Sequence, residues 1–191
     1  VDREAAAEKR RHESELERAW ITALGGERAY LTYTLDKFTP RFDLPSGFPD
    51  ETNLYITGPV GCGKTHLAAA AARASAARPH ELITTKPQQI FRAIRSCADA
   101  SGESSAIAAY ANAKVLVVDD LGVSKDSEFT AQVLYEIFDR RYMGMRGGLI
   151  VTSNFSLNEL ATKLGDDRIV SRIAGMCDVV KLTGRDRRIS K

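Results

Sequence analysis

The octapeptide 58–65, GPVGCGKT, constrains this chain more than any other segment. It fits the pattern G-x-x-x-x-G-K-[ST], in which glycines let backbone N–H groups converge on an anion that side chains would obstruct. The apolar run NLYIT precedes the octapeptide, and the Ala-rich segment HLAAAAARA follows it. Strand, loop and helix in this order are the context of a phosphate-binding loop, because the helix start adds its positive dipole. The segment therefore predicts a nucleotide site.

Lys64 and Thr65 stand where such a loop contacts phosphate and metal most directly. The Lys64 ammonium is expected to reach the β- and γ-phosphates, and the Thr65 hydroxyl to bind Mg²⁺. A glycine-rich turn without a ligand does not explain these two residues in register. His66, the next residue, is included with the loop among the residues predicted to bind nucleotide, although packing is the simpler interpretation of its side chain. The residues of this segment that we predict to bind nucleotide are Gly58, Pro59, Val60, Gly61, Cys62, Gly63, Lys64, Thr65 and His66.

Short apolar runs alternate with helical stretches along the rest of the chain. The runs carry β-branched residues without polar alternation, which is typical of strands covered on both faces. Strand and helix repeated in this way predict an α/β fold, a three-layer sandwich around a central parallel sheet of five strands. The predicted strands are 54–57, 82–85, 115–118, 149–152 and 179–182, and the predicted helices are 64–77, two within 87–112, 127–143, and two within 156–177.

Polar residues end two of the predicted strands. Asp119 and Asp120 follow the run KVLVV, and Asn154 follows GLIVTS. Parallel strands deliver functional groups at their carboxyl ends, beside the phosphate loop. Asp119 is predicted to bind Mg²⁺, directly or through water, and Asp120 to polarise the attacking water. Asn154 is predicted to hold that water. The structural alternatives are a strand stop at the two aspartates and a helix cap at Asn154, where Ser156 is also a candidate.

Composition limits the class of protein. The chain has 191 residues, enough for one domain of ordinary size, and its formal charge is 27 − 25 = +2. A polybasic nucleic-acid coat protein and an acidic disordered tail are thereby excluded as descriptions of the whole. The three cysteines are scattered without CxxC spacing, which favours a reducing, cytoplasmic setting over disulfides or structural zinc. No run reaches the roughly 18 apolar residues of a membrane helix, so no membrane partner is expected.

The sequence predicts two parts. Residues 1–50 are predicted to be a linker helix followed by a proline-rich loop, and residues 51–191 a nucleotide-binding domain. The chain begins with Val, which suggests the remnant of a longer chain.

Four segments in the same order carry a family resemblance: GPVGCGKTHLAAA, VLVVDDLG, VTSNFSLNEL and DRIVSRI. Together they resemble the AAA+ ATPases of the DnaC/DnaI helicase-loader and IstB-like group, over roughly residues 50–191. The resemblance implies a P-loop NTPase (AAA+) fold without a C-terminal lid domain. It also implies an ATPase with ATP and Mg²⁺ as cofactors.

The resemblance assigns roles to late arginines. Arg172 resembles the arginine finger that reaches the ATP of a neighbouring subunit, with Arg168 as a second candidate. The structural alternative for Arg172 is pairing with Asp166 or Asp167. Arg188 matches the last arginine of a nucleotide-sensing segment, with a frayed basic tail as the alternative.

The resemblance also identifies 87–113 as the element that lines single-stranded DNA. Arg92 and Arg95 are candidate phosphate contacts or ordinary surface charges, and Lys86 is a weaker candidate. The shared core-facing stripe of this element is predicted to be Ile90, Phe91, Ile94 and Ala98. The triplet 140–142, RRY, is interpreted as an interface or salt-bridge feature.

Three functions remain open on the sequence. The first is a loader that assembles through its ATP site into a spiral or ring on single-stranded DNA and delivers a replicative helicase. The second is an IstB-like transposition helper ATPase acting on duplex DNA. The third is a nucleotide-gated scaffold with little hydrolysis, because Asp120 stands where many relatives have Glu, one methylene longer.

Overall fold

The computed structural model describes residues 2–50, 52–123, 128–144, 147–184 and 186, with backbone alone for 2–7. Its centre is a parallel five-stranded sheet of order β2-β3-β4-β1-β5. The strands are β1 (Asn53–Thr57), β2 (Leu82–Thr85), β3 (Val115–Leu121), β4 (Gly148–Ser153) and β5 (Cys177–Lys181). The predicted strands are confirmed, and the last begins two residues earlier than expected.

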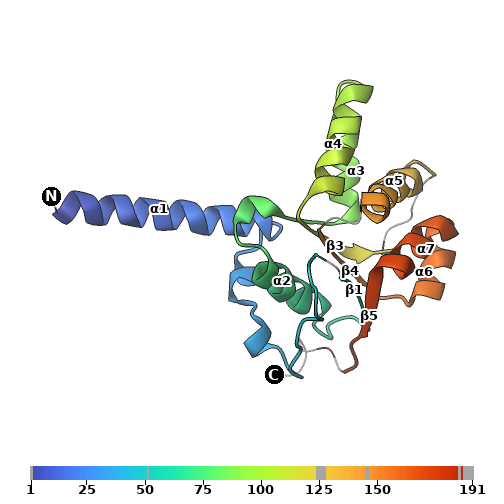
Figure 1. Cartoon of the computed structure of the whole chain (residues 1–191), viewed down its shortest axis with the longest axis horizontal. Helices are drawn as coiled ribbons and strands as arrows, with labels where there is room; N and C mark the ends of the chain where they lie inside the picture. The colour runs from blue at the N-terminus through green and yellow to red at the C-terminus, as the bar shows by residue number, and fades with distance from the viewer. Residues whose placement is uncertain (1, 51, 124–127, 145–146, 185, 187–191) are drawn as a thin grey trace.

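Helices cover both faces of the sheet (Figure 1). The α-helices are α1 (Asp2–Ala23), α2 (Lys64–Ser75), α3 (Pro87–Arg95), α4 (Ala100–Asn112), α5 (Glu128–Gly144), α6 (Leu157–Leu164) and α7 (Asp167–Met176). Short 3₁₀ helices follow α1, at η1 (Arg28–Thr32) and η2 (Leu35–Lys37), and precede β2, at η3 (Pro79–Glu81). The three-layer α/β sandwich is thus confirmed.

Side chains of β3 alternate between two buried cores. Leu116 and Val118 face the first core, which α3–α7 cover, whereas Val115 and Val117 face the second core, which α2 covers. Because both faces are covered, β3 has no polar alternation until it reaches the site. The core-facing stripe of the first insert helix is confirmed for Ile90, Phe91 and Ile94 and is wrong for Ala98. Since α3 ends at Arg95, Ala98 lies in the connection to α4 and is exposed.

The segment before β1 packs against the sheet and α2. Figure 1 shows α1 extending away from the body, with only its last residues against the second core. Leu24 and Phe38 are buried there, and Arg73 of α2 donates a hydrogen bond to the Leu31 carbonyl while lying over the Trp20 ring. None of the described helices is long and apolar enough to cross a membrane.

Arg141 is a buried structural cation. Its guanidinium donates to the carbonyls of Tyr110, Ala111, Ala113 and Gly148 over 2.8–3.3 Å, so it caps the carboxyl end of α4 and holds β4 beside it. Burial lowers its pKa to about 10. The salt-bridge interpretation of this triplet applies to Arg140, which pairs with Glu136.

Replacement of Arg141 by Ala should lower the free energy of unfolding by about 3 kcal/mol, because it leaves several buried carbonyls without donors. Arg140→Ala removes an exposed i,i+4 pair and should cost about 0.5 kcal/mol or less. Urea denaturation of both variants measures the difference. Equal losses would contradict a structural role for Arg141.

Candidate nucleotide-binding site

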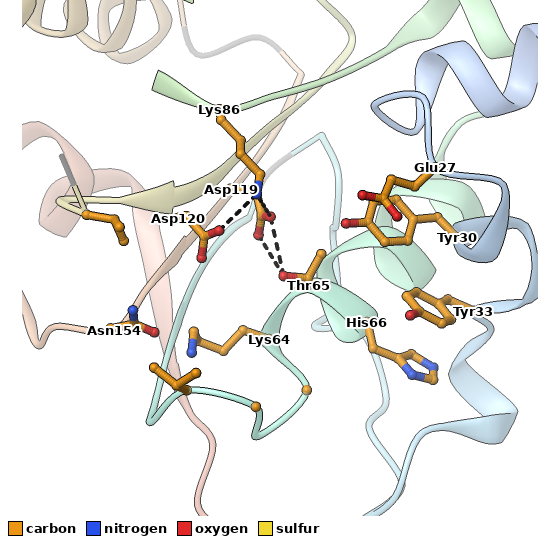
Figure 2. Close-up of a pocket in the computed structure, with 14 residues that line it drawn as sticks. Glu27, Tyr30, Tyr33, Lys64, Thr65, His66, Lys86, Asp119, Asp120 and Asn154 are labelled. Atoms are coloured by element: carbon orange, nitrogen blue, oxygen red, sulfur yellow. Dashed lines mark hydrogen bonds and ion pairs between the residues drawn. The ribbon is translucent and has the colours of Figure 1, made fainter. Parts of the chain in front are cut away.

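A cavity of about 510 Å³ opens at the carboxyl edge of the sheet (Figure 2). Three parts of the chain form it: the phosphate loop with the start of α2, the ends of β2, β3 and β4, and the segment after α1. The lining residues are Glu27, Tyr30, Tyr33, Val60, Gly61, Gly63, Lys64, Thr65, His66, Lys86, Asp119, Asp120, Val123 and Asn154.

The phosphate loop depends on glycine at two places. A Cβ at Gly58 would lie 2.4 Å from the carbonyl oxygen of Leu182, so only glycine fits against the end of the fifth strand. Gly63, at φ 105°, is left-handed and precedes the first turn of α2. Cys62, predicted to bind nucleotide, is buried in the second core and does not line the cavity. Its part of the loop is therefore anchored in the protein.

Lys64 lies folded into the loop. Its ammonium donates to the carbonyls of Gly58 (2.9 Å) and Pro59 (2.7 Å), and the residue is only 6% exposed. The loop thus holds a positive charge at its own centre, where a phosphate group would be attracted. In Figure 2 the ammonium of Lys64 points toward Asn154.

The buried carboxylate of Asp119 joins α2 to the sheet. The Thr65 hydroxyl donates to its two oxygens (3.0 and 3.3 Å), and the Thr152 hydroxyl donates to Oδ1 (2.6 Å). Asp119 is 4% exposed. Burial raises its pKa above the ordinary value, helped by the charge of Asp120 and opposed by the two hydroxyl hydrogen bonds.

Asp120 faces the same cavity and pairs with Lys86. The Lys86 ammonium lies 3.1 Å from Asp120 Oδ2 and 4.0 Å from Asp119 Oδ2. Burial lowers the pKa of Lys86, but the hydrogen bond to Asp120 and the charges of both aspartates outweigh burial and raise it. Lys86, a weak DNA candidate from sequence, is thus placed in the nucleotide cavity, where it partly neutralises the aspartates.

The chain neighbours of Asn154, Ser153 and Phe155, are hydrogen-bonded to β3 and β1. The hydroxyls of Tyr55 and Thr57 on β1 both donate to the carbonyl of Phe155, each at 2.7 Å, while Ser153 Oγ donates to the carbonyl of Leu121. These bonds hold the backbone on either side of Asn154 against β1, which leads into the phosphate loop, and against β3, which carries Asp119 and Asp120. The alternative that Asn154 caps the next helix is wrong, because Ser156 is the N-cap of α6.

Sequence reasoning missed the wall formed by the segment after α1. Glu27, Tyr30 and Tyr33 line the cavity opposite the phosphate loop. Tyr33 stacks on His66 with ring centroids 4.2 Å apart, which agrees with packing as the role of His66. Burial and the charge of Asp119 raise the pKa of Tyr30 to about 12. No motif marks these residues, since their position follows from how the segment packs on α2.

The two candidates for the arginine finger, Arg172 and Arg168, do not line this cavity. The Nε of Arg172 donates to Asp139 of α5 at 2.7 Å, and its guanidinium lies over the Tyr142 ring. The predicted pairing of Arg172 with Asp166 or Asp167 is therefore wrong. Instead, Arg168 bonds to Asp166.

The two candidate DNA contacts sit on α3, outside the cavity. Arg92 is exposed, and Arg95 lies over the Phe129 ring. Arg188 falls outside the described residues.

The donors at the metal position fit Mg²⁺. Hard divalent cations take carboxylate and hydroxyl oxygens, and Thr65 and Asp119 present both within hydrogen-bond distance of each other. Glycines and the buried ammonium of Lys64 provide the anion cradle beside them. A nucleoside triphosphate with its metal therefore suits the chemistry of this cavity.

Fold and site define a nucleotide-binding protein whose α/β fold is that of the DnaC, DnaI and DnaA structures. The chain matches the crystal structure of the DnaC helicase loader with a TM-score of 0.65 at 23% identity, over 82% of this chain and 100% of that one. DnaI matches with a TM-score of 0.66 at 24% identity, over 82% and 94%. DnaA bound to AMPPCP and single-stranded DNA matches with a TM-score of 0.63 at 23% identity, over 80% and 50%.

The chain belongs to the family of IstB-like ATP binding proteins, whose model matches residues 47–191. Among curated relatives, the replicative helicase loader DnaC of Escherichia coli K12 is 30% identical over 62% of this chain and 48% of DnaC. A putative ATP-binding protein of insertion sequence IS5376 from Geobacillus stearothermophilus is also 30% identical, over 60% of this chain and 45% of its own. The chain spans about half the length of these relatives.

The raised pKa of Asp119 carries a prediction for stability. A carboxyl whose pKa is raised on folding binds protons more tightly in the folded state, so the free energy of unfolding falls as pH rises between the unfolded value of 3.8 and the folded value. Asp119→Asn removes the cost of ionising a buried carboxyl and keeps an acceptor for the hydrogen bond from Thr152. Without nucleotide at pH 7 its Tm should rise, by about 2–4 °C for each kcal/mol gained.

The gain should shrink as the pH is lowered toward 3.8, because Asp119 is then protonated in the folded state and increasingly protonated in the unfolded state as well. Calorimetric scans of both proteins from pH 4 to pH 8 measure this. A Tm at pH 7 equal to that of the wild type would refute the destabilising role.

Proposed function

We propose that this chain is a Mg²⁺-dependent ATPase that acts as a DNA-responsive switch of the helicase-loader type. The observation that carries the proposal is the convergence of Lys64, Thr65 and Asp119 with Asp120 and Asn154 on one cavity. On this proposal ATP binding holds copies of the chain together on single-stranded DNA, where they deliver a replicative helicase. Hydrolysis then releases the assembly. The 30% identity to a helicase loader supports this function.

A transposition helper that acts on duplex DNA is the second candidate. An insertion-sequence ATP-binding protein is equally similar, and the family itself is described as IstB-like. The two candidates share the nucleotide chemistry and differ in the DNA they grip.

The residues of the cavity divide the proposed reaction among them. Lys64 and the loop amides bind the phosphates, and Thr65 with Asp119 would hold Mg²⁺. The metal, when bound, supplies positive charge to the β- and γ-phosphates. Asp120 accepts the proton of the attacking water, and Asn154 orients that water.

Arg172 completes the proposed reaction from a neighbouring copy, since within its own chain it lies outside the cavity. Its guanidinium would offset the charge that develops on the γ-phosphate.

Asp120→Asn tests the proposed base. Asp120 has φ 61°, and Asn tolerates this left-handed conformation about as well as Asp, so the substitution removes the charge with little change in backbone. Turnover should fall about 10²–10⁴-fold while ATP binding persists. Steady-state hydrolysis and equilibrium binding of a fluorescent ATP analogue measure the two effects. Unchanged turnover would rule Asp120 out as the base.

The function is tested by measuring ATP hydrolysis at rising protein concentration, without DNA, with single-stranded DNA and with duplex DNA. A rate per subunit that rises with concentration and with single strands supports the loader, whereas stimulation by duplex alone supports the transposition helper. Negligible hydrolysis despite tight ATP binding would leave the nucleotide-gated scaffold.

Mixed variants test the interface arm of the same proposal. Lys64→Ala should neither bind ATP nor assemble with it, and Arg172→Ala should bind ATP but hydrolyse it poorly. A mixture should regain part of the activity, because Lys64→Ala subunits still offer Arg172 to a neighbour. A mixture no more active than its components would contradict action between subunits.

A further inference from the structure

The two adjacent aspartates reach one cavity because β3 carries an extra residue. Val118 pairs with Val151 and Leu121 pairs with Ser153, so β3 advances three residues where β4 advances two. Such a bulge leaves one residue outside the ladder and resets the alternation of side chains. Val118 faces the first core, and Leu121 faces it again three residues later, which a regular strand would not allow.

Asp120 has the backbone conformation that accommodates the bulge. At φ 61° it is the single non-glycine residue with positive φ in the described part of the chain. Asp119 keeps the face of Val117, toward α2 and Thr65, while Asp120 turns to meet Lys86. In a regular strand Asp120 would project to the face opposite Asp119.

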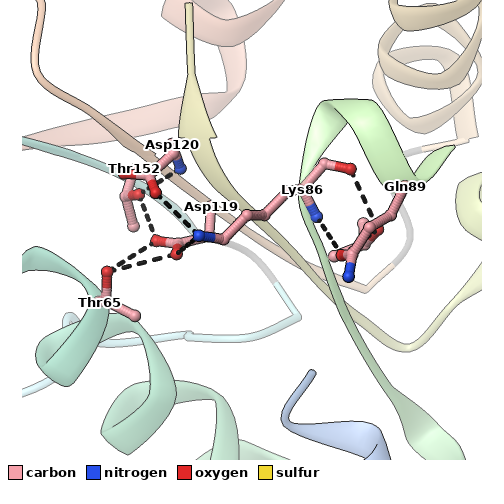
Figure 3. Close-up of polar contacts among 7 residues, drawn as sticks. Thr65, Lys86, Gln89, Asp119, Asp120 and Thr152 are labelled. Atoms are coloured by element: carbon pink, nitrogen blue, oxygen red, sulfur yellow. Dashed lines mark hydrogen bonds and ion pairs between the residues drawn. The ribbon is translucent and has the colours of Figure 1, made fainter. Parts of the chain in front are cut away.

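One hydroxyl of β4 bonds to both aspartates (Figure 3). Thr152 Oγ1 accepts a hydrogen bond from the backbone N–H of Asp120 (2.9 Å) and donates its own proton to Asp119 Oδ1 (2.6 Å). Thr152 is fully buried. Because of the bulge, the backbone N–H of Asp120 has no partner in the ladder, and the Thr152 hydroxyl oxygen accepts its hydrogen bond. The proton of the same hydroxyl is donated to the carboxylate of Asp119.

We propose that Thr152 is a positioning residue that sets the bulge of β3 and thereby holds both carboxylates for Mg²⁺-nucleotide. The proposal rests on the proposed function for what the carboxylates do, and it adds which side chain places them. Removing the hydroxyl frees the Asp120 amide from its partner and the Asp119 carboxylate from its shortest hydrogen bond. Both aspartates can then turn away from Thr65 and Lys86.

Thr152→Val keeps the shape of the side chain and removes the hydroxyl, whereas Thr152→Ser keeps the hydroxyl. A titration of Mg²⁺ against each protein with a fluorescent ATP analogue should show half-saturation at about 10–100-fold higher Mg²⁺ for Thr152→Val. Thr152→Ser should stay close to the wild type. Affinity for the analogue without Mg²⁺ should be unchanged in both, because the phosphate loop is not altered.

Thr130→Val is the matched control, since it removes another buried threonine hydroxyl, on α5 outside the cavity lining. It should leave the Mg²⁺ half-saturation unchanged. The proposal would be overturned if Thr152→Val and the wild type reach half-saturation at the same Mg²⁺ concentration while urea denaturation shows that both proteins are folded. A Thr130→Val effect as large as that of Thr152→Val would also overturn it.

Hydrogen exchange of the Asp120 amide in the wild type tests the same bond when Thr152→Val does not fold. Slow exchange supports the bond, and exchange as fast as that of an exposed loop amide overturns the proposal. Failure of the proposed function gives a different result: the wild type would then bind the analogue no better than Lys64→Ala does.

Discussion

The hydrogen-bonded carboxylate of Asp119 is the interaction on which the rest of the site depends. It joins the first turn of α2, through Thr65, to the end of β4, through Thr152. A buried carboxylate without partners is costly, and here two hydroxyls compensate only in part, so its pKa stays raised. On the proposed function, the same desolvation that costs stability would strengthen the binding of a divalent cation. Function and stability would then be opposed at this residue.

The cavity shows why the order of the strands matters. β3 and β4 are neighbours in the sheet, and β4 lies beside β1, the strand that leads into the phosphate loop. The ends of these three strands therefore meet, and Asp119, Asn154 and Lys64 come together from positions far apart in the chain. The segment after α1 closes the opposite wall with Tyr30, although the family match begins only at residue 47.

Charge inside the described cavity is divided between the cations Lys64 and Lys86 and the acidic residues, above all Asp119 and Asp120. Lys64 donates hydrogen bonds to loop carbonyls, and Lys86 is paired with Asp120. On the proposed function, Arg172 of a neighbouring copy would add a third positive charge. Within its own chain, Arg172 is held on the surface by its hydrogen bond to Asp139.

The sequence by itself determined the fold class and the phosphate loop, because unbroken apolar runs and a glycine-rich octapeptide have few other physical solutions. It also predicted which residues gather at the strand ends, since parallel strands place their carboxyl ends together. Only the tertiary structure decided the wall of Tyr30 and Tyr33, the pairing of Lys86 with Asp120, and the partner of Arg172. It alone revealed the bulge that turns Asp120 into the cavity. These features depend on contacts between distant segments, which local periodicity does not encode.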